Sequence, residues 1–111
     1  MTRVRGFVPD EGDVILLNFS PQAGHEQANR RPALVLSKAA YNAATGLLVC
    51  CPMTSKAKGY PFEVTVGPES VVLADQVKNL DWRVRAATLK GKMTAEIVAE
   101  VRGKLRALLG I

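Results

Sequence analysis

A short segment of the chain, residues 26–32, gathers polar groups that could act together on an anion. It reads Glu-Gln-Ala-Asn-Arg-Arg-Pro, so that one carboxylate, two amides and two guanidinium groups directly precede an apolar stretch. A guanidinium group stays charged at physiological pH and donates paired hydrogen bonds to two oxygens of a phosphate. The segment therefore predicts one half of a phosphate-binding site, with Arg31 as its best phosphate ligand.

Cleavage of RNA without a metal is one reaction that these groups could support. It requires attack by the 2′-hydroxyl of the substrate on the adjacent phosphorus, a base for the hydroxyl proton, positive charge on the phosphorane and an acid for the leaving 5′-oxygen. Glu26 is the candidate base, because it is the only carboxylate in the long loop and lies close in sequence to two arginines. The arginines should lower its pKa, which makes it a weaker base but keeps it ionised. Two simpler interpretations stay open: Arg31 could form a surface ion pair, and Glu26 could only orient that arginine.

The charge of the whole chain also favours an anionic partner. Fifteen basic and ten acidic residues give a net charge of +5, which in 111 residues is typical of many nucleic-acid-binding domains. If the fold brings the loops together, the basic residues between the N-terminal segment and the C-terminal helix form a groove. They are Arg30, Arg31, Lys56, Lys58, Lys78, Arg83, Arg85, Lys90 and Lys92.

The length predicts a single domain over residues 1–111, and no repeat or low-complexity tract divides it. No apolar run follows Arg3 and Arg5, as a signal peptide would require, and no run reaches the roughly 18 apolar residues of a membrane helix. We therefore expect a cytoplasmic protein that does not contact membranes.

Short apolar stretches between turn residues predict a mainly β fold, a small and strongly curved sheet or half-open barrel. A long surface loop over 20–29 separates the first two strands, and Gly46 ends a helical turn within 38–45. Cys50 and Cys51 are adjacent in one strand, so we expect two small buried side chains on opposite faces and neither a disulfide nor a metal site. The expected strands are 14–19, 31–37, 47–52, 61–66, 71–74 and 84–89.

The end of the chain is predicted to be helical. Thr94 can cap the helix and Glu96 lies in its first turn, while an apolar face repeats at helical spacing and is expected to pack on the sheet. Glu100 is expected to pair with Lys104 one turn later. A second use of this helix, as a dimer or partner surface, stays open. The apolar face consists of Ile97, Val101, Leu105 and Leu108.

Several motifs, in this order and spacing, resemble the MazF/PemK toxins of type II toxin–antitoxin pairs. The similarity runs from Val8 to Gly110. The motifs are Gly12-Asp13 before a strand ending in Phe19, Gly24-x-Glu26-Gln27, Arg31-Pro32-Ala33-Leu34-Val35-Leu36-Ser37, Pro52-x-Thr54-Ser55, Gly59-Tyr60-Pro61-Phe62 and Leu73-Ala74-Asp75-Gln76-Val77.

The resemblance implies an SH3-like barrel of the MazF/PemK/CcdB type, a homodimer and a cognate MazE-like antitoxin with an acidic tail. It also implies a sequence-selective endoribonuclease that acts on single-stranded RNA without metal or cofactor and leaves a 2′,3′-cyclic phosphate. Thr54, otherwise a turn threonine, becomes a catalytic residue beside Glu26 and Arg31. Some family members have a histidine directly before the Arg-Pro pair, whereas Arg30 stands there in this chain. The general acid is therefore open.

RNA recognition needs stacking platforms, hydrogen bonds to base edges and cations for the backbone. Phe19 is expected to stack on a base, and Lys56 and Lys58 to contact phosphates; Phe62 and Trp82 are expected in the core. Amides at Asn18, Gln27 and Gln76 could read base edges, and Arg30 could add phosphate affinity.

Two alternatives stay open. A non-catalytic nucleic-acid-binding barrel would keep the basic groove without needing Glu26 or Thr54. A CcdB-like toxin that poisons gyrase would share the fold and an apolar C-terminal tripeptide, but Leu109 stands where that family has tryptophan.

Overall fold

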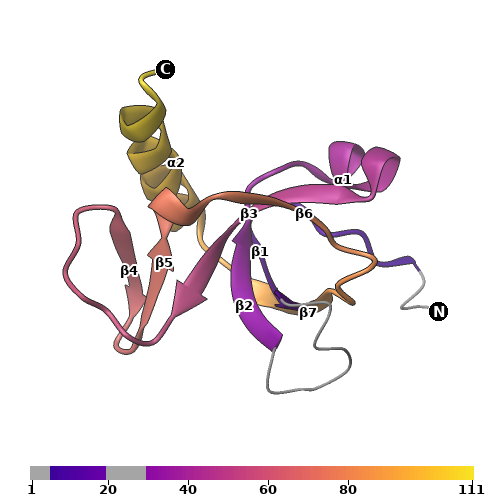
Figure 1. Ribbon diagram of the computed structural model, residues 1–111, viewed down its shortest axis with the longest axis horizontal. Coiled ribbons are helices and arrows are strands. Elements are labelled where there is room, and N and C mark those ends of the chain that lie inside the picture. Colours follow the sequence, from indigo (N-terminus) through magenta and orange to yellow (C-terminus); the bar gives the residue numbers. More distant parts are fainter. Residues whose placement is uncertain (1–5, 20–29) are drawn as a thin grey trace.

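A computed structural model describes residues 6–19 and 30–111 of the chain (Figure 1). The elements follow one another as β1 (Asp13–Asn18), β2 (Arg30–Val35), α1 (Ala39–Thr45), β3 (Leu47–Thr54), β4 (Glu63–Gly67), β5 (Ser70–Leu73), η4 (Ala74–Gln76), β6 (Lys78–Asp81), β7 (Thr88–Lys92) and α2 (Ala95–Leu109). In this part of the chain, no helix is long and apolar enough to cross a membrane.

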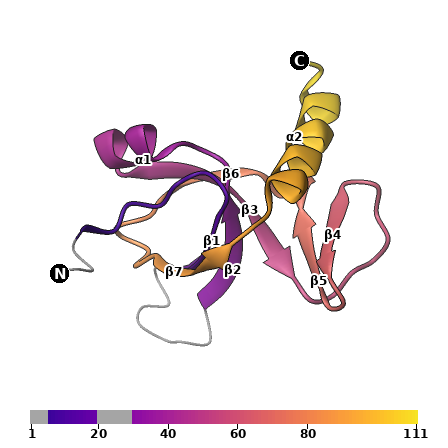
Figure 2. The ribbon, with the colours of Figure 1, turned by 180° about the vertical axis from the view of Figure 1, so that it is seen from behind.

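Strand β3 connects the two parts of a curled sheet. One of its edges pairs with β2, while the other pairs first with β6 and then, at Met53 and Thr54, with β5. The main strand order is therefore β4-β5-β3-β2-β1-β7, with β6 beside β3. Figures 1 and 2 show the sheet bending around this strand. The expected mainly β, SH3-like half-open barrel with a C-terminal helix is confirmed.

The two faces of β3 lie in two hydrophobic clusters. Cys51 packs with Val64, Val98 and Val101 on the face that α2 covers, and Cys50 packs with Trp82 and other residues on the opposite face. Both cysteines are free, and burial raises the pKa of each thiol to about 12. They are therefore buried, protonated side chains, as their positions in the sequence predicted.

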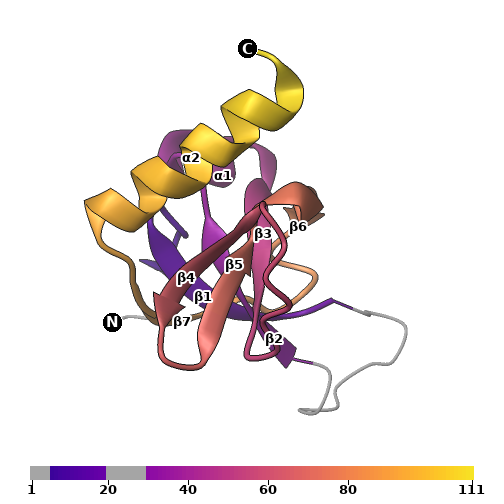
Figure 3. The same ribbon diagram turned by 90° about the vertical axis from the view of Figure 1, so that its left-hand side faces the viewer.

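Helix α2 begins as expected, because the side chain of Thr94 accepts a hydrogen bond from the Ile97 amide. Val101 is fully buried, but Leu108 remains 43% exposed, so the expectation that the whole apolar face packs on the sheet is wrong for its last turn. The expected Glu100–Lys104 pair is also absent from the described ion pairs. Instead, Lys104 Nζ donates to the carbonyl of Pro61, 2.6 Å away. Figure 3 shows α2 running diagonally above the strands.

The expected strand over 84–89 is partly wrong, and β6 was missed. Asp81 accepts hydrogen bonds from the backbone amides of Arg83 and Val84, which folds the chain into a turn before β7 starts at Thr88. β6 has the sequence Lys-Asn-Leu-Asp and lies half exposed at an edge. Three polar residues in four leave no alternating pattern from which a strand could be recognised.

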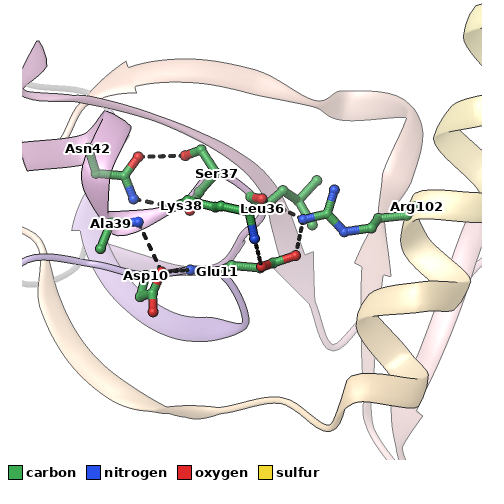
Figure 4. A network of polar contacts seen from close by, with 8 residues as sticks. All are labelled: Asp10, Glu11, Leu36, Ser37, Lys38, Ala39, Asn42 and Arg102. Carbon is green, nitrogen blue, oxygen red and sulfur yellow. Dashed lines mark hydrogen bonds and ion pairs between the residues drawn. The ribbon is translucent and has the colours of Figure 1, made fainter. Parts of the chain in front are cut away.

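A network of polar contacts connects α1 and α2 to the segment that follows the C-terminal end of β2 (Figure 4). Glu11 bonds the side chains of Lys38 and Arg102, and Arg102 also donates to the carbonyl of Leu36 at 2.8 Å. Lys38 and Arg102 hold the pKa of the Glu11 carboxyl below its usual value. The buried Asn42 side chain donates to the carbonyls of Pro9 and Ser37.

Candidate active-site groove

A groove of about 470 Å³ lies where β2 starts and β3 ends. It brings together residues from five separate stretches of the described chain. Six of the expected site residues line it: Phe19, Arg31, Thr54, Lys56, Lys58 and Gln76. The rest of its lining is Pro52, Met53, Tyr60, Glu63, Leu73, Asp75 and Lys78. Glu26 and Gln27 lie outside the described residues.

Arg31 near the start of β2 and Thr54 at the end of β3 both line this groove. The last β2–β3 pair at this end is Ala33 with Pro52, so both residues lie just beyond the paired part of the two strands. A second depression of about 420 Å³ shares both residues with the groove, together with Met53 and Lys56, and extends to Arg30, Glu69 and Ser70. Arg31, Thr54 and Lys56 therefore form a ridge between two hollows, where a chain of nucleotides could lie with its phosphate on the ridge.

Thr54 is arranged to donate its hydroxyl proton. Its Oγ1 accepts a hydrogen bond from the backbone amide of Lys56 at 3.1 Å, in the turn directly after β3. A hydroxyl group that accepts in this way still has one proton, which rotates to meet an acceptor. Because Thr54 lies on the ridge, a phosphate oxygen bound by Arg31 is a suitable acceptor.

Positive charge dominates the groove. Arg31, Lys56, Lys58 and Lys78 are exposed, and none of them forms an ion pair with another of the residues described in the structure. The groove also contains two carboxylates, Glu63 and Asp75, which the sequence had not indicated as site residues. Unpaired cations attract phosphate oxygens without first giving up a protein partner. No cluster of metal-ligating side chains occurs within 6–19 and 30–111.

Arg30 and Asn18 lie next to the groove and make other contacts. The guanidinium of Arg30 donates to the carbonyl of Leu16 at 3.1 Å and to Thr88 Oγ1 at 2.8 Å, which ties β2 across β1 to β7. It retains further donors, so its phosphate contact stays a prediction. The Asn18 side-chain oxygen is buried without a hydrogen-bond partner among the described residues, and the base contact of this residue also stays a prediction.

Arg85 holds the chain where β1 ends, a role that the sequence did not indicate. Its Nη1 donates to the carbonyls of Asn18 and Phe19, at 3.1 and 2.8 Å. The Asn18 amide in turn donates to the Arg85 carbonyl at 3.0 Å. Nothing in the local sequence distinguishes this arginine from its exposed neighbours, because its partners are backbone groups more than sixty residues away.

Known proteins are similar to this chain in sequence and in fold. The family model described as "PemK-like, MazF-like toxin of type II toxin-antitoxin system" matches residues 10–109. The endoribonuclease toxin MazF of Escherichia coli K12 is 46% identical over 110 residues, which cover 96% of this chain and 99% of that protein. The crystal structure of MazF (Form-I) from Deinococcus radiodurans has a TM-score of 0.83 at 60% identity, covering 95% of this chain and 99% of that one. The MazE-MazF (Form-III) structure from the same organism gives 0.85 at 56% identity, with the same coverage.

Proposed function

The chain belongs to the PemK-like, MazF-like toxins of type II toxin–antitoxin systems and is an endoribonuclease, and we propose that it cuts single-stranded RNA in the groove at the end of β3. The observation that carries this proposal is the ridge on which Arg31, Thr54 and Lys56 meet without a described counter-ion. Such a ridge offers a bidentate cation, a hydroxyl donor and a backbone-binding lysine to one phosphate.

The reaction proposed for this site needs no metal. The 2′-oxygen of the substrate attacks the adjacent phosphorus while its proton passes to a base, and the 5′-oxygen leaves with a proton. The products are a 2′,3′-cyclic phosphate and a free 5′-hydroxyl. Arg31 stabilises the charge that builds up on the phosphorane, and Thr54 donates a hydrogen bond to one of its oxygens. Both groups act most strongly on the transition state, where that charge is greatest.

Glu26 remains the proposed base, on the sequence argument alone. Asp75 is the competing carboxylate, since it is exposed in the described part of the groove. Replacing each carboxylate in turn by its amide shows which of the two is the base, because the loss of the base lowers kcat by a factor of about 10² to 10⁴. Arg31 or water would supply the proton to the 5′-oxygen.

We assign the contacts with RNA bases to the part of the groove away from the ridge. Phe19 and the exposed Tyr60 offer aromatic faces on which unpaired bases stack, and the amide of Gln76 can both donate to and accept from a base edge. Lys58 and Lys78 supply further contacts to the backbone. The groove thus fits a splayed single strand.

The proposed partners follow from the relatives. Solved structures from Deinococcus radiodurans are titled MazE-MazF, and we propose a MazE-like antitoxin for this chain as well. Its acidic tail would bind, in place of RNA, the groove cations that have no ion-pair partner among residues 6–19 and 30–111. We also propose a homodimer, for which the exposed Leu108, Leu109 and Ile111 offer apolar surface. Cleavage of messenger RNA in the cytoplasm would stop translation and growth.

Cleavage in the presence of EDTA tests this function. The purified chain should cut a single-stranded RNA into fragments with 2′,3′-cyclic phosphate and 5′-hydroxyl ends. RNA with a 2′-deoxy sugar at the scissile nucleotide should bind and stay intact. Cleavage of the deoxy RNA would contradict the mechanism, and RNA that stays intact after long incubation would favour the non-catalytic barrel.

A further inference from the structure

Glu63 lines the groove, yet its carboxylate is fully engaged by the backbone. Oε1 and Oε2 accept hydrogen bonds from the Lys58 amide at 3.1 and 3.0 Å, and Oε1 also accepts from the Gly59 amide at 3.0 Å. Two successive amides that point at one anion are a recurrent way in which proteins bind negative charge. Here the bound anion is a side chain of the protein itself.

The segment that Glu63 holds, residues 55–60, has few other constraints. All six residues are exposed, so no buried side chain anchors them. Besides the bonds to the Glu63 carboxylate, the described hydrogen bonds of this turn are one from the Lys56 amide to Thr54 Oγ1 at its start and one from the Glu63 amide to the Tyr60 carbonyl, 3.1 Å away, at its end. Gly59 adopts a φ of 75° between the two, a conformation that residues with a side chain rarely adopt. Lys56 and Lys58 project from this turn into the groove.

We infer that Glu63 is a positioning residue of the cleavage groove, which fixes the backbone of residues 55–60 so that Lys56 and Lys58 meet the RNA phosphates. The inference rests on the proposed function of the groove. According to this inference, an acidic residue in an RNA-binding groove increases the affinity for RNA. The charge of the carboxylate taken alone would repel RNA and reduce the affinity, so the two explanations differ in sign.

The test compares Glu63→Ala and Gly59→Ala in binding to RNA with a 2′-deoxy scissile nucleotide, and in kcat at saturating cleavable RNA. Glu63→Ala should raise Kd about tenfold, because the loosened lysines lose phosphate contacts. The value of kcat should stay within about twofold, because Arg31 and Thr54 lie on β2 and β3, outside the turn. Gly59→Ala leaves the charge unchanged but strains the turn, and a Cβ there meets no atom within 4 Å. It should raise Kd as well.

The matched control for net charge is Glu100→Ala. Glu100 is exposed on α2, away from the groove, and its removal changes the net charge by the same amount as that of Glu63. Its Kd should equal that of the unchanged protein. A lower Kd for Glu63→Ala, or an unchanged Kd for both Glu63→Ala and Gly59→Ala, would overturn the inference.

A double-mutant cycle shows whether Glu63 acts through the turn. Lys58→Ala should weaken RNA binding in the unchanged protein and have little further effect on Kd after Glu63→Ala, whereas multiplicative effects on Kd would contradict the inference.

A milder substitution serves as a check in case Glu63→Ala does not fold. Glu63→Gln keeps one acceptor oxygen and should give a Kd between those of the unchanged protein and Glu63→Ala. Amide NMR signals of Lys58 and Gly59 should shift in both Glu63 variants. If RNA is cut normally after Arg31→Ala, the proposed site fails; if only the Glu63 results fail, the site stands.

Discussion

At the two ends of β2, the same kinds of charged side chain are arranged differently. Beyond the C-terminal end of the strand, Glu11 lies 2.8 Å from Lys38 and also bonds Arg102, and Lys92 lies 3.0 Å from Asp13. At the N-terminal end, Arg31 faces a groove and has no ion-pair partner among the described residues. Paired charges join elements of the fold, whereas unpaired charges remain available to a ligand.

The cations at the two ends of β2 differ in whether they have ion-pair partners among the described residues, and not in how exposed they are. Lys38 at the paired end has a side chain that is 75% exposed, and Arg31 at the groove is exposed as well. Arg102 uses its guanidinium to bind both Glu11 and the carbonyl of Leu36, so it holds α2 against the chain after β2. Exposure alone therefore does not identify a binding cation; a place in the groove, together with the lack of an ion-pair partner among the described residues, does.

The largest expected effect comes from removing the cation at the groove end. Arg31→Ala should lower the rate of RNA cleavage by about 10³-fold, which corresponds to about 4 kcal/mol of transition-state stabilisation. The variant should unfold at the same urea concentration as the unchanged protein. Arg106→Ala, on the exposed face of α2, is the control and should cleave normally. Similar rates for both variants would remove Arg31 from the site.

The next effect belongs to the paired end and concerns stability. Asn42→Ala should lower the free energy of unfolding by about 2–3 kcal/mol, because the carbonyls of buried Pro9 and half-buried Ser37 would lose their donor. Urea denaturation measures this loss. Asn79→Ala removes an exposed asparagine that bonds only the Tyr41 hydroxyl and should cost less than about 0.5 kcal/mol. Equal losses in the free energy of unfolding for the two variants would show that the burial of the asparagine does not determine the loss.

A smaller effect depends on pH. Glu11→Gln should lower the free energy of unfolding by about 1 kcal/mol at pH 7, since it removes a charge shared by two cations. Hydrogen bonds from Lys38 and Arg102 hold the pKa of Glu11 below its ordinary value of 4.5. Its contribution is therefore present above that value and lost as pH falls through the lower pKa of the folded state. Urea denaturation should show a smaller difference between the two proteins at pH 3 than at pH 7.

The smallest effect compares one lysine from each end. Lys56→Ala should reduce the slope of log affinity for RNA against log salt by about 0.7, the contribution of one phosphate contact on a single strand. Lys38→Ala removes the same charge where it is paired with Glu11 and should leave that slope unchanged. Titrations of labelled 2′-deoxy-substituted RNA between low and high salt measure both. Equal slopes for the two variants would show that the groove does not contact the backbone through Lys56.

The sequence predicted the parts of the fold that local pattern determines. The cap at Thr94, the turn at Gly46 and the buried cysteines follow from residue type and periodicity, and all three are confirmed. β6 was missed because an exposed edge strand has no apolar alternation. The end of α2 stays exposed because nothing in the described chain covers Leu108.

The site was predictable to the extent that its residues have distinctive chemistry. The guanidinium of Arg31 predicted a phosphate contact by its chemistry alone, whereas Thr54 was predicted only through the resemblance to the MazF/PemK toxins; both line the groove. The contacts of Arg85 could not be predicted, since its backbone partners are more than sixty residues away and only the folded chain brings them within reach. The partners of Glu63 are four and five residues away, but they reach its carboxylate only through the turn at Gly59. A residue type indicates what a side chain can bind, but not which backbone atoms will be near it.

The position of β3 has a consequence for heat inactivation. This strand belongs to both parts of the sheet, contributes to both hydrophobic clusters and ends at Thr54 on the ridge of the groove. Neither half of the protein can melt without releasing the strand that the other half needs. We therefore expect one cooperative transition, in which RNA cleavage and tertiary structure are lost at the same temperature, without an inactive folded form at lower temperature.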